Sequence, residues 1–193
     1  MEVTLPKGKY VLAVSGGVDS VSLLHALKDR PGVELAVAHY DHGIRPDSTK
    51  DRRFVQKLAD AHGLRFIYEE GGLGPGASEA EAREARYGFL ERARQQYRAR
   101  AIVTAHHRDD VLETAVINLM RGSGRKGLTA LASRQDMERP LLDVSKEEII
   151  AYAKEHGLEW SDDPTNLDTD YLRNYVRHKV LPRFSRAERD RLW

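Results

Sequence analysis

The sequence predicts an α/β fold: a five-stranded parallel sheet with helices on both faces, followed by a short helical extension at the C-terminal end. Two observations predict this fold. Segments with strand character alternate with segments of helical periodicity along most of the 193 residues. The strand segments are also mostly apolar, without the apolar–polar alternation of a half-exposed strand, which is typical of strands buried on both faces of a parallel sheet.

Five short, mostly apolar segments are expected to form the strands. They cover residues 9–15, 33–40, 64–70, 99–105 and 138–142. In open parallel sheets, ligands bind outside the carboxyl ends of the strands. The loops expected at that edge are SGGVDS, HYDHGIR, GGLGPGAS and AHHRDD, in chain order. Any ligand site is therefore expected to be built from these four loops.

Helices are expected between and after the strands, where apolar residues recur at helical spacing. They cover residues 19–28, 48–62, 79–98, 109–120 and 146–156. Three serine–glutamate pairs have the spacing of a capping box, in which each side chain bonds the other residue's backbone N–H group. The pairs are Ser78 with Glu81, Ser145 with Glu148, and Ser185 with Glu188. The last pair predicts a helix that begins close to Trp193.

Composition excludes several functional classes. A charged fraction of 32% and a hydrophobic fraction of 40% are typical of a soluble globular protein, and no apolar run is long enough to span a bilayer. The absence of cysteine excludes disulfides, thiolate zinc sites and thiol nucleophiles. The formal net charge is +1, so any contact with nucleic acid must come from a local basic patch.

The stretch SGGVDS lies between the first strand and the first helix, where a phosphate group can be bound. Free backbone N–H groups and the positive end of the helix face the same point there. Its two glycines allow close approach to an anion, and Ser15 and Ser20 add hydroxyl donors. The lysine of a kinase-type phosphate loop is missing, so a pyrophosphate held by the main chain is the expected ligand. The alternative is a plain Gly-Gly turn, with Asp19 favouring the helix start.

Acidic residues gather where the loops meet. Asp109, Asp110 and Glu113 open the helix after the fourth strand, and their spacing places them on one side of it. Such an edge suits Mg²⁺, which takes few carboxylates together with substrate oxygens, although acids are also common in first helical turns. Asp41 follows the second strand, and it is either a site residue or an aspartate that caps a turn.

Basic residues recur in three places later in the chain. Arg86 lies within a helix beside Tyr87, and Arg173 and Arg177 are i,i+4 neighbours. A solvated helix face is the alternative interpretation for all three arginines. Arg121 lies among the glycines of RGSGRKG, which would let its side chain reach an anion.

Taken in order, SGGVDS, HYDHGIR, ARYGFLE, TAHHRDDVLET, RGSGRKGL, RPLL and DDPTN…RNYVRHKVLP resemble the tRNA(Ile)-lysidine synthetases, within the N-type ATP pyrophosphatase (PP-loop) superfamily. The resemblance extends from about residue 9 to residue 182. It implies a Rossmann-like sheet of the adenine nucleotide alpha hydrolase type. It also implies a PP-loop ATP pyrophosphatase domain in residues 1–145, a helical extension in residues 146–193 that completes the catalytic domain, and the absence of the family's C-terminal tRNA-binding domains.

The resemblance further implies a reaction. ATP is cut between its α- and β-phosphates, and AMP is transferred to O2 of the wobble cytidine, position 34, in an isoleucine tRNA with a CAU anticodon. Free lysine then attacks C2 and releases AMP, which leaves lysidine. The implied cofactors are ATP and Mg²⁺, and the implied partners are this tRNA and lysine. A cytoplasmic location without membrane contact is expected, and a homodimer is allowed.

Matching positions give the expected site residues. The ATP-binding residues are Ser15, Gly16, Gly17, Val18, Asp19 and Ser20. The residues of the reaction centre are Asp41, Arg86, His107, Asp110 and Arg121. The expected metal ligands are Asp19, Asp110 and Glu113, and the expected tRNA contacts are Arg173 and Arg177. Two alternatives stay open: a PP-loop ligase or amidase that acts on a small molecule, and a nucleotide-binding module without catalysis.

Overall fold

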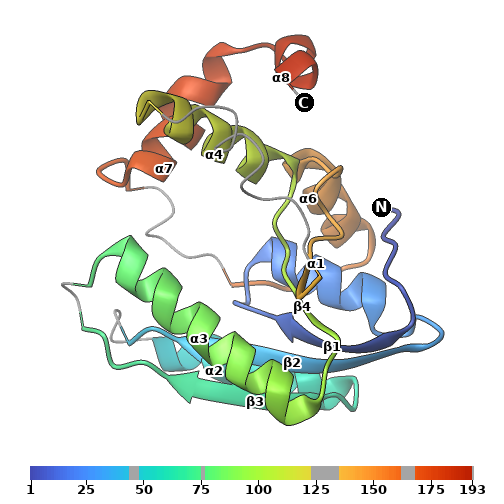
Figure 1. Ribbon diagram of the computed structural model, residues 1–193. Helices are drawn as coiled ribbons and strands as arrows, with labels where there is room; N and C mark the ends of the chain where they lie inside the picture. The colour runs from blue at the N-terminus through green and yellow to red at the C-terminus, as the bar shows by residue number, and fades with distance from the viewer. Residues whose placement is uncertain (44–47, 75–76, 123–134, 162–167, 193) are drawn as a thin grey trace.

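A five-stranded, all-parallel sheet forms the centre of the molecule, in the order β3-β2-β1-β4-β5 (Figure 1). The computed structural model describes residues 1–43, 48–74, 77–122, 135–161 and 168–192. The strands are β1 (Gly8–Ala13), β2 (Val33–Asp41), β3 (Arg65–Glu70), β4 (Ala101–Val103) and β5 (Met137–Glu138). The predicted parallel sheet is thereby confirmed, with β1 at its centre.

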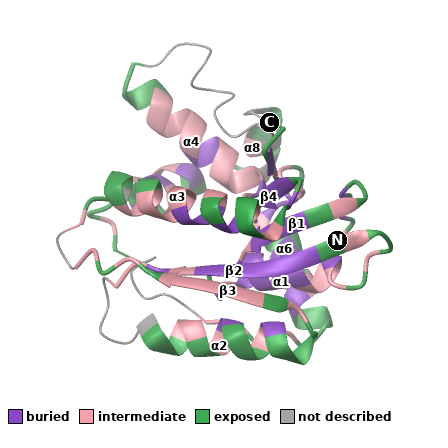
Figure 2. Ribbon diagram, turned by 60° about the horizontal axis from the view of Figure 1, so that its bottom comes forward, coloured by how far each residue is buried: buried purple, intermediate pink, exposed green. Residues whose placement is uncertain are grey.

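Helices cover both faces of the sheet, as predicted. One face packs against α1 (Val18–Leu27), α2 (Ser48–Ala61) and α6 (Lys146–Glu155), and the other against α3 (Glu79–Tyr97). Figure 2 shows α2 and α3 on opposite sides of β2 and β3. Side chains of β1 alternate between the two cores: Tyr10 and Leu12 join the α1 side, whereas Val11 joins Phe89 of α3. All three β1 side chains are fully buried.

The C-terminal helices pack on α4 (Arg108–Met120). They are α7 (Leu172–Tyr175), a π-helical turn (Val176–Val180), a 3₁₀ turn (Leu181–Arg183) and α8 (Arg186–Leu192). Leu112 of α4 forms a separate buried cluster with Val176 and Leu181, and Figure 1 shows α4, α7 and α8 grouped together. None of the helices in the described ranges combines the length and apolarity needed to cross a bilayer.

The predicted capping boxes fix where two helices begin. Ser78 accepts from the Glu81 backbone N–H and Ser145 from that of Glu148, and each glutamate accepts from the serine in return. Because a capping box sets the first residue of a helix, it also sets which side chains lie in the first turns. The two serine–glutamate pairs therefore determine which polar side chains of α3 and α6 lie next to the loops at the carboxyl edge of the sheet.

Two strands, β4 and β5, are much shorter than predicted. The segment expected at 138–142 forms a ladder only up to Glu138, because Pro140 has no N–H group to donate and the Leu142 N–H turns back to the Arg139 carbonyl at 3.3 Å. Beyond β5, an isolated parallel bridge joins His107 and Leu141. The strand expected at 99–105 covers only residues 101–103, although the Thr104 N–H still donates to the Glu138 carbonyl at 3.0 Å.

Candidate active site

The SGGVDS loop joins β1 to α1 and leaves the first turn of α1 uncapped. Gly17 is the N-cap residue, and it has no side chain to accept from the free N–H groups of that turn. Gly16 has a φ of +101°, which favours glycine. The Ser20 hydroxyl donates to the Gly17 carbonyl at 3.0 Å and lies 3.3 Å from the Ser15 hydroxyl. The loop therefore presents N–H groups and hydroxyls at the positive end of a helix, as anion binding requires.

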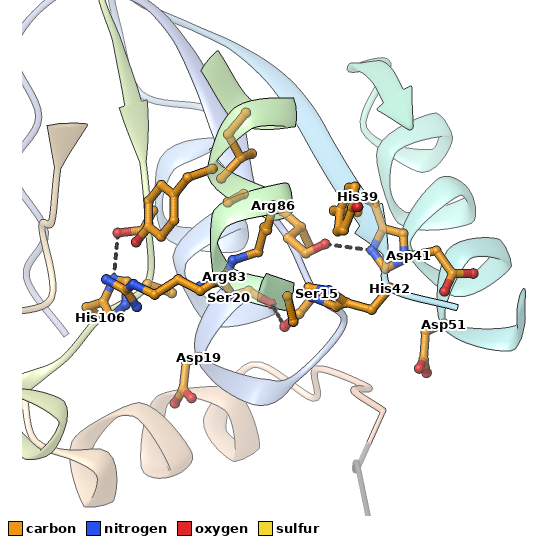
Figure 3. A pocket seen from close by; sticks show the side chains of 18 of the residues that line it. Ser15, Asp19, Ser20, His39, Asp41, His42, Asp51, Arg83, Arg86 and His106 are labelled. Carbon is orange, nitrogen blue, oxygen red and sulfur yellow. Dashed lines mark hydrogen bonds between the residues drawn. The ribbon is translucent and has the colours of Figure 1, made fainter. Parts of the chain in front are cut away.

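A pocket of about 560 Å³ opens beside this loop, at the carboxyl ends of β1, β2 and β4. The predicted site residues that line it are Ser15, Asp19, Ser20, Asp41, Arg86, Asp110, Arg173 and Arg177. In Figure 3, Ser15 and Ser20 lie between Asp41 and His106, with Asp19 below them. The volume is that of a small-molecule site. The fold thus gathers, in one pocket, residues from β1, β2, α3, α4 and the C-terminal helices.

His107 lies just outside the pocket lining, surrounded by three carboxylates. Its Nε2 is 3.5 Å from Asp110 Oδ2 and 3.8 Å from Asp19 Oδ2, and its Nδ1 is 3.6 Å from Asp109 Oδ2. Burial alone would lower the pKa of His107, but Asp109, Asp110 and Asp19 raise it above its ordinary value. The imidazolium is therefore favoured, and it links the SGGVDS loop to the first turn of α4.

Four aspartates line the pocket, and two of them, Asp19 and Asp110, approach the same imidazole nitrogen and could share a metal ion. Both lie within 4 Å of His107 Nε2, and both line the pocket. No group of three or more histidine, aspartate or glutamate side chains is placed to hold a metal among the described residues. Mg²⁺ at phosphate sites takes one or two carboxylates and completes its shell with water and phosphate oxygens. The donor set fits an ion that is shared with a phosphate ligand.

Glu113, Arg173 and Arg177 form an ion-pair cluster between α4 and the C-terminal helices. The Glu113 side chain is 1% exposed, and its carboxylate accepts from Arg173 Nε at 3.1 Å and from Arg177 Nε at 2.6 Å. Arg177 Nη2 also lies 3.4 Å from Asp110 Oδ1. The two arginines are therefore not a solvated helix face. Glu113 lies outside the pocket lining, and both of its oxygens are bound by arginine.

Helix α3 contributes two arginines to the pocket, Arg83 and Arg86. Their guanidinium groups lie 4.9 and 5.3 Å from the centroid of the Tyr87 ring. Burial lowers the pKa of Arg86, but arginine stays protonated in proteins. Arg83 was not among the predicted site residues. The available signal was its position three residues before Arg86, which places both side chains on one side of the helix.

Asp41 ends β2 and is 3% exposed. Its Oδ1 accepts from the Gly43 N–H at 2.9 Å, as an aspartate that caps a turn would. Its Oδ2 is buried and has no hydrogen-bond partner among the described residues. A buried carboxylate oxygen without a donor is costly, so a donor supplied by a ligand would stabilise it. Asp41 therefore serves the turn with one oxygen, while its other oxygen is buried without a donor in a residue that lines the pocket.

Arg121 is set apart from the other predicted site residues. It caps the C-terminal end of α4, and a helix of 13 residues carries it about 20 Å from His107. Its side chain is exposed and does not line the pocket. The rest of RGSGRKG after Gly122, at 123–127, and the DDPTN motif, at 162–166, lie outside the described residues.

Lys146 contacts a site residue, Asp19, and nothing in the sequence pattern predicts this contact. It is the first residue of α6, and its Nζ donates to Asp19 Oδ1 at 2.6 Å. The two residues are 127 positions apart, and they meet because α6 packs beside α1. Sequence spacing cannot report a contact of this kind.

The sequence matches the PP-loop domain family over residues 2–184. It is 43% identical over 195 residues to a tRNA(Ile)-lysidine synthase of Thermus thermophilus, covering 95% of this chain and 38% of that protein. It is 38% identical over 180 residues to the tRNA(Ile)-lysidine synthase of Solibacter usitatus, covering 92% of this chain and 41% of that protein. The chain therefore spans about two fifths of the length of these relatives.

Solved structures support the same fold. A U34-tRNA thiolase of Methanococcus maripaludis has a TM-score of 0.68 at 18% identity, over 93% of this chain and 73% of that one. The NMN synthetase of Francisella tularensis has a TM-score of 0.57 at 15% identity, over 97% of this chain and 83% of that one. With the uncapped SGGVDS turn at the head of its pocket, the chain belongs to the PP-loop domain family.

Proposed function

We propose that the chain is the catalytic part of a tRNA(Ile)-lysidine synthase. Such an enzyme ligates free lysine to C2 of the wobble cytidine, position 34, in an isoleucine tRNA with a CAU anticodon. ATP adenylates O2 of that cytidine and releases pyrophosphate, and the lysine amine then forms the C–N bond while AMP leaves with the oxygen. This enzyme acts in the cytoplasm, where its tRNA and ATP are found.

One observation carries the proposal. The anion-binding loop opens into the same pocket as Asp41, Arg86 and Asp110, so the groups for a nucleotide and for its acceptor share one space. The curated relatives named tRNA(Ile)-lysidine synthase match along 92–95% of this chain. A module that only bound a nucleotide would not need both acids and arginines in the same pocket.

The pocket residues have distinct proposed roles. The backbone N–H groups of the SGGVDS loop hold the departing pyrophosphate, and the Ser15 hydroxyl adds a donor, while the Ser20 hydroxyl donates to the Gly17 carbonyl within the loop. Arg83 and Arg86 stabilise negative charge on the phosphates from the α3 side. The unpartnered oxygen of Asp41 accepts from the cytidine or from the lysine amine.

Asp19 and Asp110 are the proposed Mg²⁺ ligands. The ion supplies charge that stabilises the phosphate oxygens. Glu113 orients Asp110 indirectly, because Arg177 contacts both Glu113 and Asp110. His107 keeps the two carboxylates close to each other, since its Nε2 lies between them.

The test is transfer of labelled lysine to a transcript of isoleucine tRNA with a CAU anticodon. The chain is incubated with ATP, Mg²⁺ and a high concentration of tRNA, and AMP and pyrophosphate are measured together with label in the tRNA. We expect one AMP and one pyrophosphate per lysine transferred, and no label in a matched transcript with a GAU anticodon.

Two results would contradict the proposal. Release of ADP instead of AMP would exclude cleavage of ATP between its α- and β-phosphates. Release of AMP without tRNA, in response to a small molecule, would favour the alternative of a small-molecule ligase.

A further inference from the structure

Lys146 is held beside the SGGVDS loop by acids from two other helices. Its Nζ donates to Asp19 Oδ1 at 2.6 Å, and its backbone N–H donates to Asp109 Oδ2 at 2.9 Å. The Ser145–Glu148 capping box fixes Lys146 as the first residue of α6. Backbone and side chain are thus both directed to the point where α1 and α4 begin.

We propose that Lys146 supplies, from α6, the cation that binds the β- and γ-phosphates of ATP. The SGGVDS loop contains no lysine, whereas kinase-type phosphate loops carry theirs within the loop. Here the lysine comes from a helix 127 positions further along the chain. This inference rests on the proposed use of ATP, and it extends that use by naming a contact for the leaving pyrophosphate.

The negative charge of Asp19 beside the loop favours a cation near the bound phosphates. Asp19 lines the pocket one residue after the N-terminal end of α1, so its carboxylate would repel a pyrophosphate held by the loop. Lys146 already neutralises that carboxylate through their ion pair. If Asp19 bound a metal ion, the Lys146 ammonium group would be free to donate to the oxygens of a phosphate held by the loop.

The exposure of the pair favours this exchange over a purely structural role. The side chains of Lys146 and Asp19 are 37% and 29% exposed. Ion pairs with such access to water contribute little to stability, so little is lost when the lysine changes partner. The long, flexible stem of lysine also permits a short movement from carboxylate to phosphate. By contrast, Arg177 is bound to the buried Glu113 carboxylate.

The experiment compares Lys146→Gln and Lys146→Arg with the wild-type chain, and uses Lys154→Gln as the control. Lys154 lies on the same helix, is exposed, and is two turns away from the site. Affinities for ATP, inorganic pyrophosphate and AMP are measured by calorimetry in the presence of Mg²⁺, and thermal unfolding is followed in parallel. AMP lacks the two phosphates that Lys146 is proposed to contact.

Lys146→Gln is expected to weaken the binding of ATP and of pyrophosphate by at least about tenfold, the effect of losing one charged hydrogen bond, with AMP binding unchanged. Lys146→Arg should retain part of the affinity for ATP and for pyrophosphate. Lys154→Gln should retain the wild-type affinity for all three ligands. Melting temperatures should agree within about 4 °C.

Three outcomes would overturn the inference or its basis. Unchanged ATP and pyrophosphate affinity in Lys146→Gln would exclude the contact. An equal loss for ATP and AMP, together with a markedly lower melting temperature, would assign Lys146 a structural role. Failure of the wild-type chain itself to bind ATP would instead reject the proposed function, and the inference with it.

Discussion

Gly16 and Gly17 are adjacent in the sequence, but each is required for a different reason. Gly16 has a φ of +101°, which disfavours any residue with a Cβ, although a Cβ there would make only ordinary contacts of 3.5 Å with Phe54 and Val55. Gly17 has a φ of −72°, and a Cβ there would meet only the Ser15 hydroxyl at 3.6 Å. The first glycine is therefore needed for the fold, and the second leaves open space for a ligand.

Valine at each position should separate these two roles. Gly17→Val is expected to fold with a melting temperature close to that of the wild type, but to lose ATP binding by at least about tenfold, since a branched side chain occupies the approach to the loop. Gly16→Val should lower the unfolding free energy by about 1–2 kcal/mol or more, because of its φ angle. Thermal unfolding and calorimetry with ATP measure both effects. Normal ATP affinity in folded Gly17→Val would remove the basis for assigning this loop to phosphate binding.

Asp110→Asn tests whether the Asp110 carboxylate takes part in the reaction or only favours the start of α4. Asn retains an oxygen that can accept from the His107 N–H, so the start of α4 should be preserved. Its loss of charge weakens metal binding, and turnover is expected to fall by about tenfold to a hundredfold while ATP affinity changes much less. Lysine transfer at saturating tRNA and ATP is the measurement. Unchanged turnover at high Mg²⁺ would mean that Asp110 only favours the helix start.

At the scale of elements, helix α4 has two roles. Its first turn contributes Asp110 to the pocket, and the C-terminal helices pack against its side. The ion pairs of Glu113 with Arg173 and Arg177 join these elements beside the apolar cluster of Leu112 and Val176. Because Arg177 also contacts Asp110, the packing of the C-terminal helices and the geometry of the pocket are coupled.

Glu113→Gln tests this coupling. Removing the charge takes away the carboxylate that both partly buried arginines contact, although Arg177 keeps its contact with Asp110, and we expect a loss of about 2 kcal/mol in unfolding free energy. Glu147→Gln is the matched control, because its side chain is 64% exposed and lies 3.9 Å from Arg189. Denaturant unfolding of both variants in the absence of Mg²⁺ measures the difference. If Glu113→Gln loses stability only when Mg²⁺ is present, Glu113 acts as a metal ligand and not as the partner of these arginines.

At the scale of the whole molecule, the charge balance limits how strongly this chain can hold tRNA. The formal net charge is +1, and Arg173 and Arg177, which line the pocket, are bound to Glu113. Each phosphate contact contributes roughly one unit to the slope of log affinity against log salt. Only a few contacts are therefore available from these residues.

We expect this chain to bind tRNA weakly, with a salt slope smaller than about 3, and ATP with ordinary affinity. Titration of labelled tRNA at several salt concentrations gives the slope, and a version extended by a C-terminal domain serves as the comparison. The extended version should bind more tightly and with a steeper slope. Equal affinities and slopes in the two would show that further domains are not the main tRNA contact.

The sequence by itself determined the elements and the loop chemistry. Buried strands were recognisable as continuous apolar runs, because both faces of the sheet are covered, and the capping boxes of α3 and α6 set their first residues. The SGGVDS turn was recognisable because a glycine at positive φ and an uncapped helix start are local properties.

Only the tertiary structure decided how the charged groups pair. Lys146 meets Asp19, and Glu113 turns to Arg173 and Arg177, because helices distant in the chain pack side by side. The acids of α4 share one side of the helix in the sequence, yet Asp109 binds the Lys146 backbone, Asp110 lines the pocket and Glu113 is buried beneath it. Local spacing fixes which side chains share a helix face, whereas the partner of each charge depends on whichever element packs against that face.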